Sequence, residues 1–155
     1  MNYPIDIQHA SKESSPVTDE QLRDWVILAL QLELEAAELT LRLVNPEEMT
    51  ALNHLYRKKN KPTNVLAFPA SHPAHIELEC PLLGDVIICP QVLEEESQSL
   101  NTPLIAHWAH IVIHGVLHLL GYDHMNEDDT NKMQSIEIQL LAVLGFDNPY
   151  ESEVN

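Results

Sequence analysis

The chain has 155 residues, 24 acidic and 8 basic side chains, and a formal net charge of −16. This length suits one domain with a sizeable core, and the two cysteines, Cys80 and Cys89, fit no disulfide scaffold or metal spacing. The charge argues against a surface that attracts nucleic acids uniformly. Residues 1–12 contain no charged segment followed by a long apolar run, so we expect no signal peptide and a cytoplasmic location.

Hydrophobic periodicity and capping residues predict a mixture of helices and strands. Thr18 with Gln21 forms a predicted capping box, and Asn45 followed by Pro46 is typical of a helix start. In chain order the pattern predicts a strand at 2–8, a helix at 18–35, a strand at 38–44, a helix at 45–56, strands at 63–68 and 82–89, and helices at 90–100, 103–120 and 126–144. These elements do not alternate strictly, so we expect one α+β domain over residues 1–155. It has a small mixed four-stranded sheet, about five helices and a tail at residues 146–155.

The positive charge is concentrated in one short segment. Four of the eight Lys and Arg residues are Arg57, Lys58, Lys59 and Lys61, whereas residues 1–56 carry ten acids and three bases. A basic segment on an acidic molecule is where a polyanion would dock, because the remaining surface repels it. Taken alone, however, such a segment is more simply a solvated surface loop.

Residues 114–124 read His-Gly-Val-Leu-His-Leu-Leu-Gly-Tyr-Asp-His. His114 and His118 share one face of a helix, and Gly121 can end that helix in the left-handed conformation and turn His124 toward them. Three imidazoles suit zinc at about 2.0–2.1 Å per Zn–N bond and leave a fourth position for water or substrate. One histidine in an apolar helix is usually a core residue, but three at this spacing predict a catalytic metal site.

Four other histidines are assigned different roles. His110 lies one helical turn before His114 and is predicted to support the metal site or to face the substrate. His107 lies further away and is predicted to pack or cap. His72 and His75 have a spacing that metals use, but they lie in a proline-containing loop without a third ligand, so we interpret them as surface residues.

The histidine spacing also matches the metzincin pattern H-E-x-x-H-x-x-G-x-x-H, with one departure. Gly115 stands where a metalloprotease carries its general-base glutamate. Peptidases of that type need this carboxylate to take a proton from the zinc-bound water. The sequence therefore predicts a metal site but disfavours zincin proteolysis.

Several sequence blocks together resemble the YbeY family of bacterial metal-dependent endoribonucleases, and the resemblance covers nearly the whole chain. The blocks are NHLYR at 53–57, KPTNVLAFP at 61–69, GDVII at 84–88, and HWAH at 107–110 running into 114–124. One departure is Asn64, where the family often has Asp, and it affects no catalytic assignment. The resemblance implies a single-strand-specific RNA hydrolase that acts in 16S rRNA 3′-end maturation and 70S ribosome quality control. Its expected partners are ribosomal RNA and ribosomal particles, with no membrane.

The resemblance also implies a set of site residues. It makes His114, His118 and His124 the ligands of one Zn²⁺, although imidazole ligands also accept other divalent transition metals such as nickel, cobalt or copper. It makes Arg57 the functional basic residue. We expect Arg57 and His114 to be catalytic, with Arg57 contacting the phosphate and stabilising the negative charge of the transition state. The other substrate-binding residues, expected to attract the RNA backbone, are Lys58, Lys59 and Lys61.

Two questions stay open at this point. Asp123 and Asp85 are candidates for the proton acceptor, although Asp123 can equally orient an imidazole or close the turn, and Asp85 can be structural. The alternative function is a non-catalytic ribosome assembly factor, in which zinc stabilises the helix exit and the basic segment docks on ribosomal RNA. A zincin-like peptidase is a more distant alternative.

Overall fold

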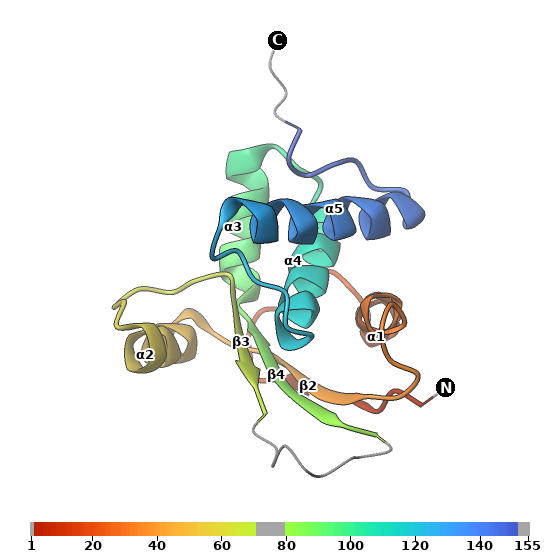
Figure 1. Ribbon diagram of the computed structural model, residues 1–155. Coiled ribbons are helices and arrows are strands. Elements are labelled where there is room, and N and C mark those ends of the chain that lie inside the picture. The colour runs from red at the N-terminus through yellow and green to blue at the C-terminus, as the bar shows by residue number, and fades with distance from the viewer. Residues whose placement is uncertain (1, 71–79, 152–155) are drawn as a thin grey trace.

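A computed structural model describes residues 2–70 and 80–151 of the chain, so His72 and His75 lie outside the described residues. The described part forms five helices and four strands, as the sequence predicted (Figure 1). They are β1 (Ile5–His9), α1 (Asp19–Leu30), β2 (Glu38–Leu43), α2 (Pro46–Arg57), β3 (Val65–Pro69), β4 (Leu82–Ile88), α3 (Pro90–Leu100), α4 (Leu104–Leu119) and α5 (Glu127–Val143).

The four strands form one mixed sheet in the order β1-β2-β4-β3. Strands β1, β2 and β4 are parallel, and β3 pairs antiparallel with β4. The predicted α+β class with a mixed four-stranded sheet is therefore confirmed. Among the described residues β3 has β4 as its single neighbour, so its other edge is free.

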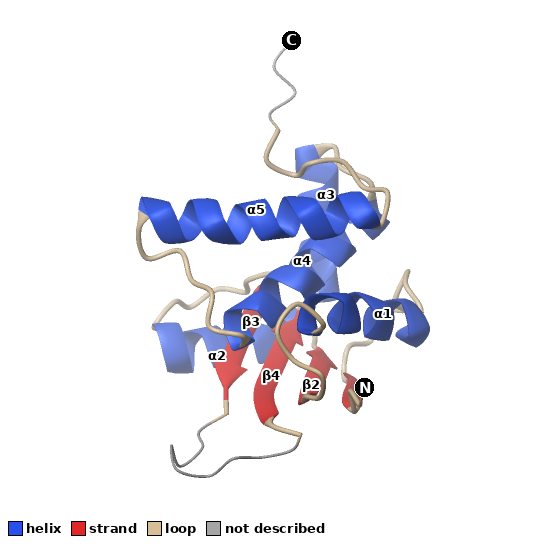
Figure 2. Cartoon of the chain, turned by 45° about the vertical axis from the view of Figure 1, so that its right-hand side comes forward, coloured by secondary structure: helices blue, strands red, loops and turns tan. Residues whose placement is uncertain are grey.

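Helices cover both faces of the sheet. Because side chains alternate between the faces of a strand, Val86 of β4 packs toward α4 while its neighbour Ile87 joins a smaller cluster with Met49 of α2. Figure 2 shows α4 lying between the sheet and α5, with α1 beside α4. Helix α4 is thus buried on most sides, and Trp108 in its first half is fully covered.

Burial explains why α4 is nearly all apolar. From His107 onward its less buried positions form a stripe of three histidines, His110, His114 and His118, spaced by one turn each. No helix in the described part of the chain is long and apolar enough to cross a membrane.

Two predicted boundaries were wrong by three or more residues. Helix α1 begins at the predicted Thr18–Gln21 capping box but ends at Leu30 rather than near residue 35. The last turn tightens through the bond from Leu32 N–H to the Ala29 carbonyl, and the chain must then return to enter β2. Strand β1 begins at Ile5 rather than at residue 2, because Pro4 has no N–H to donate to a ladder.

Asn45 also has a different role from the one predicted. It occupies the N-cap position of α2, but its side chain makes no capping hydrogen bond. Its Oδ1 instead accepts hydrogen bonds from the Lys12 backbone N–H at 2.9 Å and from the Ser11 hydroxyl at 3.3 Å. Asn45 therefore fastens the segment after β1 to the start of α2.

Candidate metal centre

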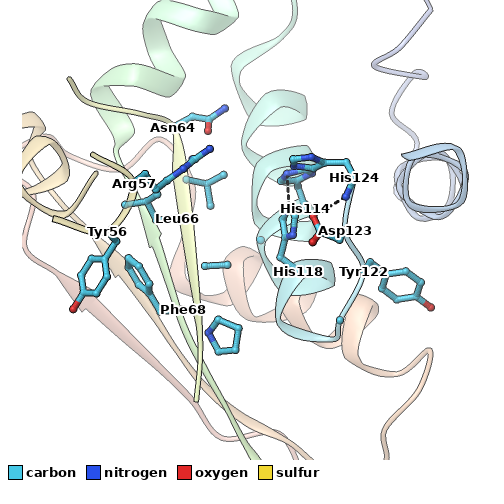
Figure 3. Close-up of a pocket in the computed structure, with 15 residues that line it drawn as sticks. Tyr56, Arg57, Asn64, Leu66, Phe68, His114, His118, Tyr122, Asp123 and His124 are labelled. Carbon is cyan, nitrogen blue, oxygen red and sulfur yellow. Dashed lines mark hydrogen bonds between the residues drawn. The ribbon is translucent and has the colours of Figure 1, made fainter. Parts of the chain in front are cut away.

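The end of α4 brings three histidines together. Gly121 has a φ of +104°, a left-handed conformation that favours glycine, and its N–H donates to the His118 carbonyl at 3.0 Å. The Tyr122 N–H reaches the Leu117 carbonyl at 3.0 Å, which closes the turn. The predicted reversal at Gly121 is confirmed, and it carries His124 back beside the helix (Figure 3).

The geometry of these three rings fits a divalent metal. The Nε2 atoms of His114 and His118 are 3.1 Å apart, and the His118 and His124 ring centroids are separated by 5.1 Å. One ring nitrogen from each histidine lies within 4.8 Å of the others. Tetrahedral bonds of about 2.0–2.1 Å would place ligand nitrogens roughly 3.3 Å apart. The cluster therefore needs small adjustments to hold an ion.

Electrostatics favours the ligand form of His118. Burial lowers its pKa below the ordinary value, and repulsion from His114 and His124 lowers it further. A lowered pKa keeps the imidazole neutral near pH 7, which is the form that binds a metal.

Behind His114 lies a buried carboxylate that the sequence reasoning missed. Glu137 of α5 is 0% exposed, and its Oε2 lies 2.6 Å from Nδ1 of His114. Because Nδ1 donates to this ionised oxygen, Nε2 of His114 keeps its lone pair directed toward His118. The signal in the sequence was a glutamate at a core-facing position of the last helix, between Met133 and Leu140.

The Glu137 carboxylate accepts hydrogen bonds from two more side chains. His110 Nε2 lies 3.1 Å from Glu137 Oε1, and the Tyr150 hydroxyl donates to that oxygen as well. Burial by itself raises the pKa of the Glu137 carboxyl, but the hydrogen bonds and charges of His110 and His114 outweigh it and keep the pKa well below the usual range. The predicted tail thus contributes Tyr150 to the support of the site, as His110 does.

The three residues His110, His114 and Glu137 are also close enough to hold a metal ion. Their ligand atoms, however, already satisfy one another through hydrogen bonds. The cluster of His114, His118 and His124 instead opens onto a cleft. Both clusters share His114, through different ring nitrogens.

A cleft of about 690 Å³ joins the histidine cluster to the end of α2 and to β3. Arg57, His114, His118 and His124 all line it, as does Tyr56. Figure 3 shows Arg57 reaching across β3 toward the histidines. The structure thus brings together the arginine and the three histidines that the sequence singled out. The exposed Lys58, Lys59 and Lys61 lie outside the lining.

The basic segment is held in place by a buried amide. Asn53 is 1% exposed, and its Nδ2 donates to the Lys61 carbonyl at 2.8 Å. Lys58 takes the left-handed conformation, with φ 59°, that ends α2. The loop after Arg57 is therefore anchored at both ends.

The free edge of β3 forms one wall of the cleft. Antiparallel pairing joins Asn64 to Cys89 and Ala70 to Leu83 by backbone hydrogen bonds. Since such bonds alternate along a strand, the even-numbered residues of β3 bond to β4. The N–H and C=O groups of Val65 and Ala67 therefore point away from β4, into the cleft that these residues line.

The other candidate residues lie as follows. Asp123 lines the cleft, and its Oδ1 accepts the His124 backbone N–H at 2.7 Å, so it closes the turn. Asp85 is exposed and points to the sheet face opposite Val86, away from α4. His107 is buried and its Nε2 lies 2.9 Å from Glu96, so it packs between α3 and α4.

Gly115 allows α4 to approach the sheet closely. A Cβ at this position would lie 2.7 Å from Val86 Cγ1 and 3.2 Å from Val65 Cγ2. A side chain as large as glutamate would have to displace β3 or β4. Close packing of α4 on the sheet therefore requires glycine at the position where a metalloprotease has its general-base glutamate.

Fold and site together define an α+β protein with a three-histidine centre at a helix exit, open to a cleft that also holds an arginine. A family model described as Endoribonuclease YbeY matches residues 6–145. The chain belongs to this family.

Curated relatives agree with that membership, and a solved structure shares the fold. Proteins named Endoribonuclease YbeY from Legionella pneumophila strains Corby and Paris are each 59% identical over 155 residues, which is 100% of this chain and 98% of theirs. The solution structure of TM1509 from Thermotoga maritima has a TM-score of 0.59 at 23% identity, covering 95% of this chain and 97% of that one. This last likeness concerns the fold alone.

Proposed function

We propose that this protein is a single-strand-specific, zinc-dependent endoribonuclease that hydrolyses RNA phosphodiesters. The observation that carries the proposal is one cleft lined by both Arg57 and the three histidines, in a chain of the YbeY family. We further propose that it acts in 16S rRNA 3′-end maturation and 70S ribosome quality control, as a single domain over residues 1–155. Because its substrate would be ribosomal RNA and ribosomal particles, the proposed location is the cytoplasm.

His114, His118 and His124 would hold the ion. A bound Zn²⁺ supplies Lewis-acid chemistry, polarising a phosphoryl oxygen or lowering the pKa of a water ligand. The Glu137 carboxylate accepts the hydrogen bond from His114 Nδ1, and this leaves Nε2 of His114 directed into the cleft. We assign His114 a catalytic role as the metal ligand that Glu137 orients in this way.

Arg57 would bind the scissile phosphate. Its planar guanidinium offers paired charge-assisted hydrogen bonds, which strengthen as negative charge builds on the phosphoryl oxygens. Lys58, Lys59 and Lys61 are exposed outside the cleft lining, so they would attract the RNA backbone before and after the cleaved bond. The free N–H groups of Val65 and Ala67 offer further donors along the wall.

The test is a cleavage assay on single-stranded RNA with purified protein. Cleavage should disappear with a chelator and return with zinc. Arg57→Ala should lose most of the activity and keep its metal, whereas His114→Ala should lose both. Arg23→Ala on α1 removes an exposed arginine outside the cleft lining and serves as the matched control.

Two outcomes would contradict the proposal. RNA binding without cleavage under any metal would favour the non-catalytic assembly factor instead. Loss of metal in Arg57→Ala would make Arg57 structural. The peptidase alternative is disfavoured by Gly115, because this position has no carboxylate and no room for one.

A further inference from the structure

An exposed aromatic ring stands beside the arginine of the cleft. Tyr56 is 60% exposed although it is large and mostly apolar. It is the residue immediately before Arg57, at the last turn of α2, and both residues line the cleft. Single exposed apolar residues are common on protein surfaces, so exposure by itself carries no conclusion.

The ring of Tyr56 is supported by a second aromatic side chain. Its centroid lies 4.7 Å from that of Phe68 on β3, with the two planes tilted by 51°. Phe68 also lines the cleft and packs against the small core under α2. A ring held from one side in this way loses little conformational freedom when something stacks on its open side.

The residues around the Tyr56–Phe68 pair indicate which kind of ligand would bind there. In Figure 3, the Tyr56–Phe68 pair lies on one side of β3 and the three histidines on the other, and Arg57 reaches across the strand from the side of the pair. The segment that follows Tyr56 carries four of the eight cationic side chains of an otherwise acidic chain. An aromatic ring next to an arginine matches a ligand that carries a flat aromatic group next to a phosphate. A nucleotide of an unpaired strand is such a ligand.

We propose that Tyr56, supported by Phe68, is a stacking subsite for an unpaired nucleobase adjacent to the phosphate held by Arg57. The inference rests on the proposed RNA substrate. A base inside a duplex is already stacked on both sides, so this subsite would favour single-stranded over double-stranded RNA. It would tolerate all four bases, because each has an aromatic face.

The test measures base stacking separately from cleavage. A short phosphorothioate RNA that contains 2-aminopurine, whose fluorescence falls on stacking, is titrated with zinc-loaded protein. Tyr56→Ala should weaken binding about 5- to 150-fold and abolish the quenching. Tyr56→Phe should keep both. Leu55→Ala is the matched control, since Leu55 is 68% exposed next to Tyr56 but lies outside the cleft lining.

Tight binding and full quenching in Tyr56→Ala would overturn the subsite. Phe68→Ala gives a second reading, because it should lower the affinity for RNA by loosening the Tyr56 ring. Cleavage of an ordinary single-stranded RNA by the unaltered protein is measured in parallel. If that cleavage is present while Tyr56→Ala behaves normally, the subsite alone fails. If the unaltered protein neither binds nor cleaves RNA, the proposed function fails with it.

Discussion

At residue 137 a carboxylate is fully buried in the contact between α4 and α5. Taking an ionised carboxylate out of water costs several kcal/mol unless hydrogen bonds and opposite charges compensate. His110, His114 and Tyr150 provide that compensation here. This desolvation cost is consistent with a residue that sets the orientation and the tautomer of a metal ligand.

We therefore expect Glu137→Gln to weaken zinc binding about 10- to 100-fold, the usual effect of removing a carboxylate behind a metal-bound histidine. Competition with a chromogenic chelator measures the zinc Kd. Glu127→Gln changes an exposed glutamate at the start of the same helix and should leave the Kd unchanged. Equal zinc affinity in Glu137→Gln and the unaltered protein would show that the carboxylate does not position His114.

Helix α4 carries two constraints on adjacent faces. Its outer stripe holds His110, His114 and His118, and its inner side at Gly115 touches the sheet. The distance between the histidine cluster and β3 is therefore fixed, because α4 cannot move away from the sheet without losing core contacts. Packing at Gly115 therefore sets the position of the metal centre on the neighbouring face of the helix.

Replacing Gly115 by alanine tests this packing. Alanine improves helix propensity by about 1 kcal/mol, but overpacking a rigid core costs about 1–3 kcal/mol, and Val86 is a stiff β-branched neighbour. We expect a net loss of about 1 kcal/mol in the free energy of unfolding, measured by urea denaturation. The loss should shrink in a Val86→Ala background, which makes room for the new methyl group. A more stable Gly115→Ala protein would contradict the close contact.

The histidine motif and the turn at Gly121 were predictable from sequence because they depend on local spacing alone. Spacing also gave the capping box at Thr18 and most strand positions. The missed features depend on contacts between distant segments. Glu137 lies 23 residues from His114 along the chain, and Tyr150 joins them from the predicted tail. No periodicity marks the end of α1 at Leu30, where tertiary packing overrides helix propensity.

For the whole molecule, the charge distribution decides how RNA could approach. A formal net charge of −16 repels a polyanion from most directions. The basic segment after α2 is the exception, and Asn53 fixes it beside the cleft. An acidic protein with one basic entry would orient a nucleic acid strand toward the histidine cluster and discourage other contacts.

RNA affinity should accordingly depend on few charges. With at most four phosphate contacts and a slope of about 0.7 per contact on a single strand, log K should fall with log salt at a slope no steeper than roughly −2.8. Lys59→Ala should make the slope shallower by about 0.7 without abolishing cleavage. Arg23→Ala on α1 should leave it unchanged, and a much steeper slope would place the RNA on a different surface.

The most direct test of the central claim is anomalous diffraction from crystals of the zinc-loaded protein, which locates the ion itself. The account predicts one zinc per chain, bound by nitrogens of His114, His118 and His124, with Nε2 as the ligand atom of His114 and a remaining position open to the cleft. An ion held instead by His110, His114 and Glu137, or closed off by a fourth side chain, would contradict it.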